Sequence, residues 1–222
     1  MITVHHLEHS RSQRVLWLLE ELGVPYEIKA YSRDPKTMLA PPELRAVHPL
    51  GKSPVIVDDG VTVAETGAIV EWILERHAGG RLAPPAGTPE RARLAYWLHY
   101  AEGSAMPPLL LKLVFMRLAT GVPFLLKGLV GAIAGRAQSS FIDPQLKAHA
   151  DYWEAELSKS EWFAGPDFSA ADIMMSFPLE AAASRGGALE GRPHVKAFLD
   201  KIHARPAYRR ALEKGGPYAY AD

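Results

Sequence analysis

The first eighty residues alternate between segments with the two-residue period of a strand and segments with the period of a helix. Residues 2–6 form a short β-prone run, residues 12–22 place apolar side chains at helical spacing, and residues 26–30 alternate as a second strand. Gly23 follows the helical segment, and glycine readily ends a helix. The connection has the length of a parallel βαβ crossover, so the start of the chain predicts an α/β unit.

A β-hairpin and a second long helix follow in the pattern. After a loop and a short segment at residues 42–47, two apolar runs flank Asp59 and Gly60. Asp-Gly between apolar runs is the strongest short hairpin signal. A helix then begins near Glu65 and fades before Gly79. The predicted order of elements is therefore βαβ, α, ββ, α.

No segment after residue 80 has a convincing strand pattern. Residues 81–88 are rich in glycine, proline and alanine, which is typical of a linker. The segments that have the pattern of helices with one apolar face are residues 91–118, 143–158, 170–184, 193–204 and 206–214. We therefore expect an α/β domain over residues 1–80, a linker over 81–88 and an all-α domain over 89–222.

The composition excludes several kinds of chemistry. Lysine and arginine together number 25, as do aspartate and glutamate, so no overall field attracts nucleic acid or an anionic membrane, and we expect neither as a partner. The absence of cysteine excludes disulfides, thiolate-bound zinc and a protein thiol nucleophile. The histidines lack the spacing of a metal-binding motif, so no metal is expected. Any thiol chemistry would need a substrate that brings the sulfur.

The chain shows no sign of a targeting or membrane-spanning segment. Its N-terminus lacks the basic start and apolar run of a secretory signal, so we expect a cytoplasmic protein. Lys112, Arg117 and Lys127 interrupt the most hydrophobic stretch, residues 109–135, which falls short of about 18 uncharged apolar residues. This stretch predicts a helix pair that is buried or forms a dimer contact. Residues 106–124 either line an apolar pocket or contact a partner subunit.

The tripeptide Ser53-Pro54-Val55 stands directly before the first strand of the hairpin. A proline cannot donate to a sheet ladder, and a cis peptide bond at Ser53-Pro54 would account for its position. Such a turn would aim the backbone N–H and C=O of Val55 outward, where an extended peptide could pair with them. An ordinary proline at the start of a strand is the alternative interpretation.

Glu65 and Thr66 open the second long helix. The free N–H groups and positive dipole end of a helix N-terminus favour a carboxylate, Thr66 can donate a hydrogen bond to it, and Glu65 can pair with an ammonium group. Together the two residues match the α-carboxylate and α-amine of an amino acid. A simple N-cap by Thr66 is the alternative.

Ser10 lies between the first predicted strand and the first helix, where α/β proteins commonly hold ligands. A thiol at such a helix N-terminus has a lowered pKa, and a serine hydroxyl can donate a hydrogen bond to the thiolate. Ser12 is close enough to be the contact instead. We favour Ser10, because Ser12 falls where the helix itself needs a cap.

Ser169 and Asp172 have the spacing of a capping box, with Phe168 and Ile173 as its apolar staple. The box predicts the start of a buried helix and has a role in folding.

The motifs in this order resemble the cytosolic glutathione transferase family over essentially the whole chain. Residues 48–55, His-Pro-Leu-Gly-Lys-Ser-Pro-Val, are similar to the family's glutathione-backbone loop with its cis-proline, and Glu65-Thr66 to its acidic residue and serine. Residues 6–12 and 40–44 are most similar to the theta-like group of fungi and bacteria. The resemblance implies a thioredoxin-like N-terminal domain followed by an all-helical domain.

The resemblance also implies roles for individual residues. These are the catalytic serine for Ser10, a basic group near the glycine carboxylate of glutathione for Lys52, the backbone-binding loop for Ser53, Pro54 and Val55, and the grip on the γ-glutamyl group for Glu65 and Thr66. Thr66 stands where the family usually has serine, and it keeps the hydroxyl.

The function that the resemblance implies is conjugation of the glutathione thiolate to an apolar electrophile, as in detoxification, by a homodimer that uses glutathione as co-substrate and no metal. Two alternatives stay open. A glutathione-dependent peroxidase or disulfide reductase would use the same thiolate, and a non-catalytic glutathione-binding or assembly module would keep only the fold. Sequence does not identify the second substrate.

Overall fold

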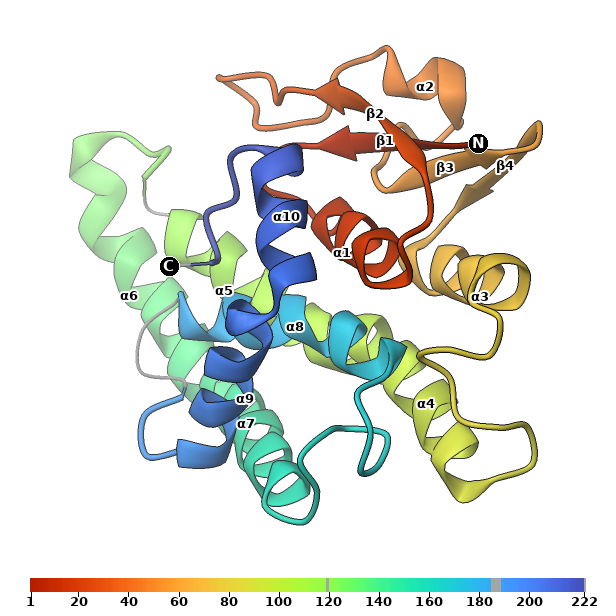
Figure 1. Cartoon of the computed structure of the whole chain (residues 1–222). Helices are drawn as coiled ribbons and strands as arrows, with labels where there is room; N and C mark the ends of the chain where they lie inside the picture. The colour runs from red at the N-terminus through yellow and green to blue at the C-terminus, as the bar shows by residue number, and fades with distance from the viewer. Residues whose placement is uncertain (119, 185–188, 222) are drawn as a thin grey trace.

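The computed structural model describes the whole chain except residues 119, 185–188 and 222. Its sheet has four strands in the order β2-β1-β3-β4. The strands are β1 Ile2–Leu7, β2 Tyr26–Tyr31, β3 Val55–Asp58 and β4 Val61–Ala64. β1 pairs with β2 in parallel, and the remaining pairs are antiparallel (Figure 1). The predicted βαβ unit and the hairpin at Asp59-Gly60 are both confirmed.

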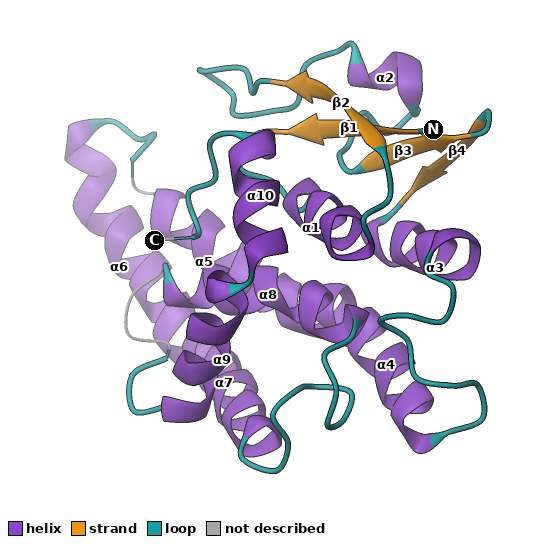
Figure 2. Cartoon of the chain, in the orientation of Figure 1, coloured by secondary structure: helices purple, strands orange, loops and turns teal. Residues whose placement is uncertain are grey.

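Three helices belong to this α/β part: α1 Ser12–Leu22, α2 Leu44–Val47 and α3 Thr66–His77. α1 and α3 lie between the sheet and the helices of the second half of the chain (Figure 2). α1 ends where predicted, because Gly23 adopts the left-handed conformation (φ 63°) and its N–H bonds back to carbonyls of the last turn. The α/β fold of the first part is therefore as predicted.

The second part of the described chain is built from helices. They are α4 Pro89–Tyr100, α5 Met106–Leu118, α6 Lys127–Ala137, α7 Asp143–Leu157, α8 Ala170–Ala183, α9 Pro193–Ala204 and α10 Pro206–Gly215. This confirms an all-helical second part, while the boundaries 1–80, 81–88 and 89–222 stay predictions. Among the described residues, no helix is long and apolar enough to span a bilayer.

The helix predicted over residues 91–118 is not continuous. A π-helical turn at Ala101–Ala105 separates α4 from α5. Pro107 and Pro108 follow in the first turn of α5, and neither has an N–H to donate to the preceding turn. A local change from the α to the π pattern accommodates such a loss, and π turns are frequent at functional sites.

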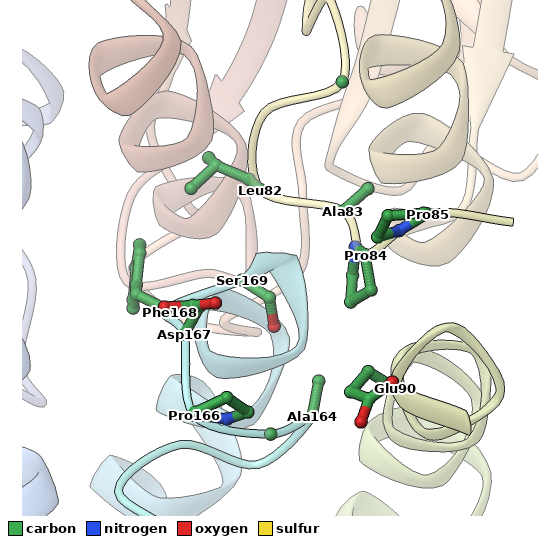
Figure 3. A pocket seen from close by; sticks show the side chains of 12 residues that line it. Leu82, Ala83, Pro84, Pro85, Glu90, Ala164, Pro166, Asp167, Phe168 and Ser169 are labelled. Carbon is green, nitrogen blue, oxygen red and sulfur yellow. The ribbon is translucent and has the colours of Figure 1, made fainter. Parts of the chain in front are cut away.

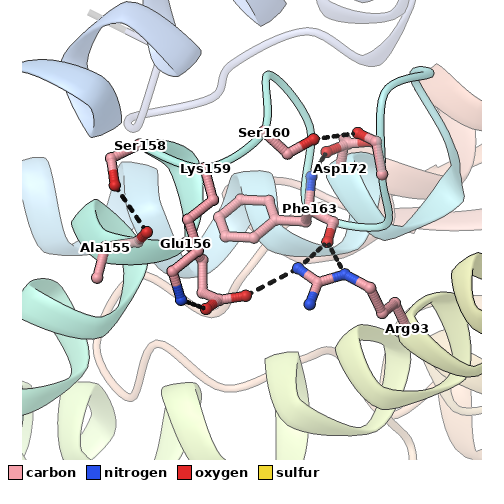
Figure 4. Close-up of polar contacts among 9 residues, drawn as sticks. Arg93, Ala155, Glu156, Ser158, Lys159, Ser160, Phe163 and Asp172 are labelled. Carbon is pink, nitrogen blue, oxygen red and sulfur yellow. Dashed lines mark hydrogen bonds and ion pairs between the residues drawn. The ribbon is translucent and has the colours of Figure 1, made fainter.

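α8 is the central helix of the helical part, with every residue from Ala170 to Ala182 buried. The predicted capping box begins it: Ser169 accepts a hydrogen bond from the N–H of Ala171 (3.3 Å), and Asp172 accepts one from the N–H of Ser169 (2.8 Å). Asp172 also accepts from the N–H of Phe163 (2.8 Å; Figure 4). The box therefore fixes both the helix and the loop before it.

Replacing Ser169 with alanine is expected to lower the free energy of unfolding by about 1 kcal/mol, because the N-terminus of α8 loses a hydrogen-bond acceptor. Ser158→Ala is the matched control, since that hydroxyl caps an exposed helix end by donating to the carbonyl of Ala155 (Figure 4). Chemical denaturation measures both. Equal, small losses for the two variants would show that the box contributes no more than a surface hydroxyl.

The two parts of the chain pack against each other through α1. Trp17 of α1 is fully buried and its ring contacts Phe168 and Tyr208, with centroid distances of 5.7 and 5.0 Å. At the rim, Arg205 donates to both carboxylate oxygens of Glu21, at 2.6 and 2.9 Å. This interface holds α1 against the helical part, which matters for the site described next.

Candidate functional site

A cavity of about 250 Å³ lies where the loop before β3, the start of α3 and the helical part meet. Five of the residues singled out from the sequence line it, namely Lys52, Ser53, Pro54, Glu65 and Thr66. Five others that line it were not predicted as site residues, namely Arg11, His48, Leu50, Ala64 and Glu102. Ser10 and Val55, which were, do not line it.

The N-terminus of α3 forms one wall of this cavity. Glu65 precedes the helix with a positive φ of 70°, which is uncommon for a residue other than glycine and typical of functional sites. No side chain caps α3, so the alternative interpretation of Thr66 as an N-cap is wrong. Thr66 is buried and accepts a long hydrogen bond from Arg14 (3.4 Å). The helix N-terminus therefore remains able to bind an anion.

The loop before β3 forms the opposite wall. The Ser53-Pro54 peptide bond is cis, as predicted. The hydroxyl of Ser53 accepts from the N–H of Leu7 (3.2 Å) and donates to the carbonyl of His5 (2.9 Å), which ties the loop to β1. Gly51 has a φ of 57°, and a Cβ there would lie 2.7 Å from a side-chain carbon of Arg45. The loop thus keeps a shape that a larger residue at Gly51 would not allow.

The predicted role of Val55 is wrong in its geometry. β3 is an inner strand, and Val55 lies opposite His5 of β1 on one side and Ala64 of β4 on the other. Its backbone N–H and C=O therefore face a neighbouring strand, not an open edge. Ser53, which directly precedes the cis bond, makes no backbone hydrogen bond to any described residue.

Ser10 lies at the start of α1, where it was expected. Its side chain is largely buried, and its Oγ lies 2.7 Å from the Oγ of Ser12. Ser10 also accepts a hydrogen bond from the N–H of Ser12 (3.2 Å). The expectation that Ser12 caps α1 is therefore wrong. It is Ser10 that accepts a hydrogen bond from an N–H of the first turn of α1.

Ser12 is completely buried and belongs to a chain of hydrogen bonds behind Ser10. Its Oγ lies 2.8 Å from Nδ1 of His6, and it also accepts from the N–H of Leu7 (3.3 Å). Burial lowers the pKa of His6, which keeps the ring neutral at neutral pH. If Nδ1 carries the ring proton, Ser12 accepts from His6 and donates to Ser10, and the hydroxyl proton of Ser10 is left for a ligand.

Arginine and glutamate side chains form the floor of the cavity. Glu102, in the π-helical turn, forms ion pairs with Arg11 (3.2 Å) and with the fully buried Arg14. Arg14 also donates to the carbonyl of Met174 in α8 (2.8 Å). Burial alone would raise the pKa of Glu102, but the charges of Arg14 and Arg11 lower it, so the carboxylate stays ionised. The floor therefore joins the first helix to the helical part.

Other cavities lie away from these groups. One of about 420 Å³ lies between residues 80–85, Glu90 and the loop at 164–169 (Figure 3), and one of about 800 Å³ opens beside α3 and the same proline-rich segment. Neither is lined by a residue that was predicted to bind a ligand. No group of three or more metal-binding side chains occurs among the described residues. We therefore take the smaller cavity as the candidate site, because the residues predicted to bind a ligand line it and not the two larger ones.

Comparisons with known proteins agree with this choice. Residues 10–76 match the family description "Glutathione S-transferase, N-terminal domain", and residues 142–206 match "Glutathione S-transferase, C-terminal domain". The chain is 36% identical to glutathione S-transferase 3 of Schizosaccharomyces pombe, covering 96% of this chain and 88% of the relative. It is 34% identical to glutathione S-transferase 1 of Saccharomyces cerevisiae, covering 96% and 95%.

Solved structures show the same fold. A glutathione S-transferase of Actinobacillus pleuropneumoniae superimposes with a TM-score of 0.78 at 30% identity, covering 100% of this chain and 96% of that one. A sphingomonad glutathione S-transferase in complex with glutathione gives a TM-score of 0.75 at 25% identity, covering 96% and 98%. None of these names tests the resemblance to the theta-like group.

Proposed function

Because the chain belongs to the glutathione S-transferase family, we propose that it binds glutathione in the cavity beside α3 and joins the glutathione thiolate to apolar electrophiles. The sulfur forms a new bond to carbon while the leaving group of the electrophile departs. One observation carries the proposal: residues 52–54 and 65–66, distant in sequence, line a single cavity together with the start of α1. These groups match the two charged ends and the peptide backbone of that tripeptide.

Each part of glutathione has a partner in this proposal. The γ-glutamyl carboxylate lies at the uncapped N-terminus of α3 with the hydroxyl of Thr66, and the amine pairs with Glu65. Lys52, which is exposed, pairs with the glycine carboxylate. The free backbone groups of Ser53 pair with the cysteinyl backbone, in place of the clamp by Val55.

The sulfur then lies toward the N-terminus of α1, where three features favour the thiolate. These are the helix dipole, the guanidinium of Arg11 and a hydrogen bond from Ser10. Catalysis consists of thiolate formation and proximity to the electrophile, without a covalent intermediate on the enzyme. We place the enzyme in the cytoplasm, in detoxification, and as a homodimer, as is expected for the family.

Replacing Glu65 with glutamine is expected to weaken glutathione binding about tenfold, because a charge-assisted hydrogen bond to the amine is lost. Glu71→Gln is the matched control, since Glu71 is exposed on the same helix and outside this cavity. Calorimetric titration measures both dissociation constants. Equal effects in the two variants would place the amine elsewhere.

The function itself is tested with the wild-type protein. Titration with glutathione at millimolar concentration is expected to show binding, and turnover is then compared for an aryl halide, an organic peroxide and a mixed disulfide. Preference for the aryl halide supports conjugation, whereas preference for either other substrate supports the peroxidase or reductase alternative. Binding without any turnover would make the protein a binding module, and no binding would overturn the proposal.

A further inference from the structure

The exposed apolar side chains of this protein are concentrated in one region. Seventeen large apolar side chains are exposed among the described residues, and eleven of them lie between residues 110 and 141. These eleven are Leu110, Leu111, Val114, Met116, Leu118, Phe124, Leu125, Leu126, Leu129, Ile133 and Phe141. None lines any of the three cavities described above, so the interpretation of this region as a pocket wall has no support in those cavities.

The two most exposed of them lie at one end of a helical hairpin. α5 ends at Leu118, and the chain reverses and resumes with a short turn, Phe124–Leu126, before α6. α5 and α6 pack side by side, so the last turn of the one and the first turn of the other lie at the same end. Phe124 and Leu125 are 84% and 90% exposed. We call the residues Val114, Arg117, Leu118, Phe124, Leu125, Leu126, Lys127 and Leu129 the hairpin tip. It lies at the outer edge of the molecule (Figure 1).

The segment that contains the hairpin tip carries charge of one sign. Residues 103–142 contain two lysines and two arginines but no aspartate or glutamate, although the chain as a whole is balanced. Lys112 is paired with Asp143 (2.7 Å), whereas Arg117 and Lys127 belong to the tip itself. The tip therefore combines apolar side chains with positive charge. This combination is typical of elements that lie on an anionic bilayer surface.

A second copy of the chain is less complementary to this surface. If the tip packed on the tip of a second copy, Arg117 and Lys127 of the two copies would share one interface without a carboxylate of residues 103–142 between them. An anionic bilayer instead supplies an apolar layer for Phe124 and Leu125 and negative headgroups for the two cations.

We propose that the hairpin tip docks on anionic lipid bilayers, with Phe124 and Leu125 in the boundary of the acyl chains and Arg117 and Lys127 among the headgroups. The contact is peripheral, which agrees with the absence of a spanning helix among the described residues. It revises the expectation of no membrane partner, which considered the net charge of the whole chain and the length of a span. The proposal does not depend on the proposed transferase function.

Flotation with lipid vesicles tests the proposal on the full-length protein. The wild type is expected to float with vesicles of mixed phosphatidylcholine and phosphatidylserine, and much less with phosphatidylcholine alone or at high salt. The double variant Phe124→Ser, Leu125→Ser is expected to lose binding to both. The charge reversal Arg117→Glu, Lys127→Glu is expected to weaken binding to the anionic vesicles by about tenfold or more.

A matched control and a second measurement separate this proposal from its rival. Leu39→Ser removes another exposed leucine (61% exposed) far along the chain, and it should float like the wild type. The tip side chains are exposed, so thermal unfolding of the tip variants should match that of the wild type. Failure of the wild type to bind anionic vesicles, or equal binding by the tip variants, would overturn the proposal. A change from dimer to monomer in light scattering, without a change in flotation, would assign the tip to a second copy instead.

Discussion

Replacing Ser10 with alanine is expected to lower kcat for glutathione conjugation by about a hundredfold, while glutathione binding changes little. The variant removes a donor that acts on the negative charge of the sulfur, and loss of one such donor costs about two orders of magnitude in comparable sites. The pKa of the bound thiol should rise in parallel. Ultraviolet absorbance of the thiolate, measured across pH with glutathione bound, reports that shift independently of turnover.

Two further variants decide which group contacts the sulfur. Arg11→Met removes the cavity-lining cation that directly precedes α1, and Ser12→Ala breaks the chain of hydrogen bonds that leads from His6 to Ser10. If one of these two residues contacts the sulfur in place of Ser10, Ser10→Ala would keep full kcat and an unchanged pKa of the bound thiol. If Arg11→Met or Ser12→Ala instead lowers kcat and raises that pKa, the residue replaced in that variant is the partner of the thiolate. Binding of glutathione by all three variants is the control for an intact site.

Replacing Arg14 with methionine is expected to lower the free energy of unfolding by about 3 to 5 kcal/mol. The guanidinium is 1% exposed and serves Glu102, the carbonyl of Met174 and the hydroxyl of Thr66 together. Its loss leaves a partly buried carboxylate with Arg11 alone and a buried carbonyl with one donor fewer. Denaturant unfolding measures the loss, and Arg117→Met, an exposed arginine in α5, is the control.

The double variant with Glu102→Met tests the cause, because it removes the unpaired carboxylate and should recover part of the stability. The pH dependence gives a second test. The pKa of Glu102 is lowered in the folded protein, so its contribution is complete above the unfolded pKa of about 4.3 and is lost as the pH falls through the folded pKa. The difference in stability between wild type and Glu102→Gln should therefore shrink in acid. A difference that is constant with pH would contradict the ion pair.

The elements of the fold could be predicted where local chemistry decides them. Gly23 ends α1 because it accepts a left-handed conformation, Asp59-Gly60 makes the hairpin, and Ser169 with Asp172 starts α8. The break between α4 and α5 was missed. It depends on how the chain accommodates Pro107 and Pro108 within an otherwise helical pattern, and periodicity alone does not reveal this.

The candidate site was predicted in part for the same reason. Glu65 and Thr66 are identified by their place at a helix start, and Pro54 by its place before a strand. Glu102 belongs to a helical segment of the second half of the chain, and its contact with Arg14 joins residues 88 positions apart. Sequence spacing carries no signal for such a contact. The position of Val55 within the sheet was misjudged because the strand order, with β3 inside, was not known from the sequence.

The π-helical turn at Ala101–Ala105 carries Glu102 into the lining of the cavity, so both halves of the chain contribute residues to it. A fragment ending in the proline-rich segment would retain Lys52, Glu65 and Thr66 but would lack Glu102, and with it the counter-charge of both arginines. Ligand occupancy and assembly of the halves are then thermodynamically linked. A molecule bound beside α3 would stabilise the contact between the two halves. The force or the protease concentration needed to separate them should therefore rise when the ligand is bound.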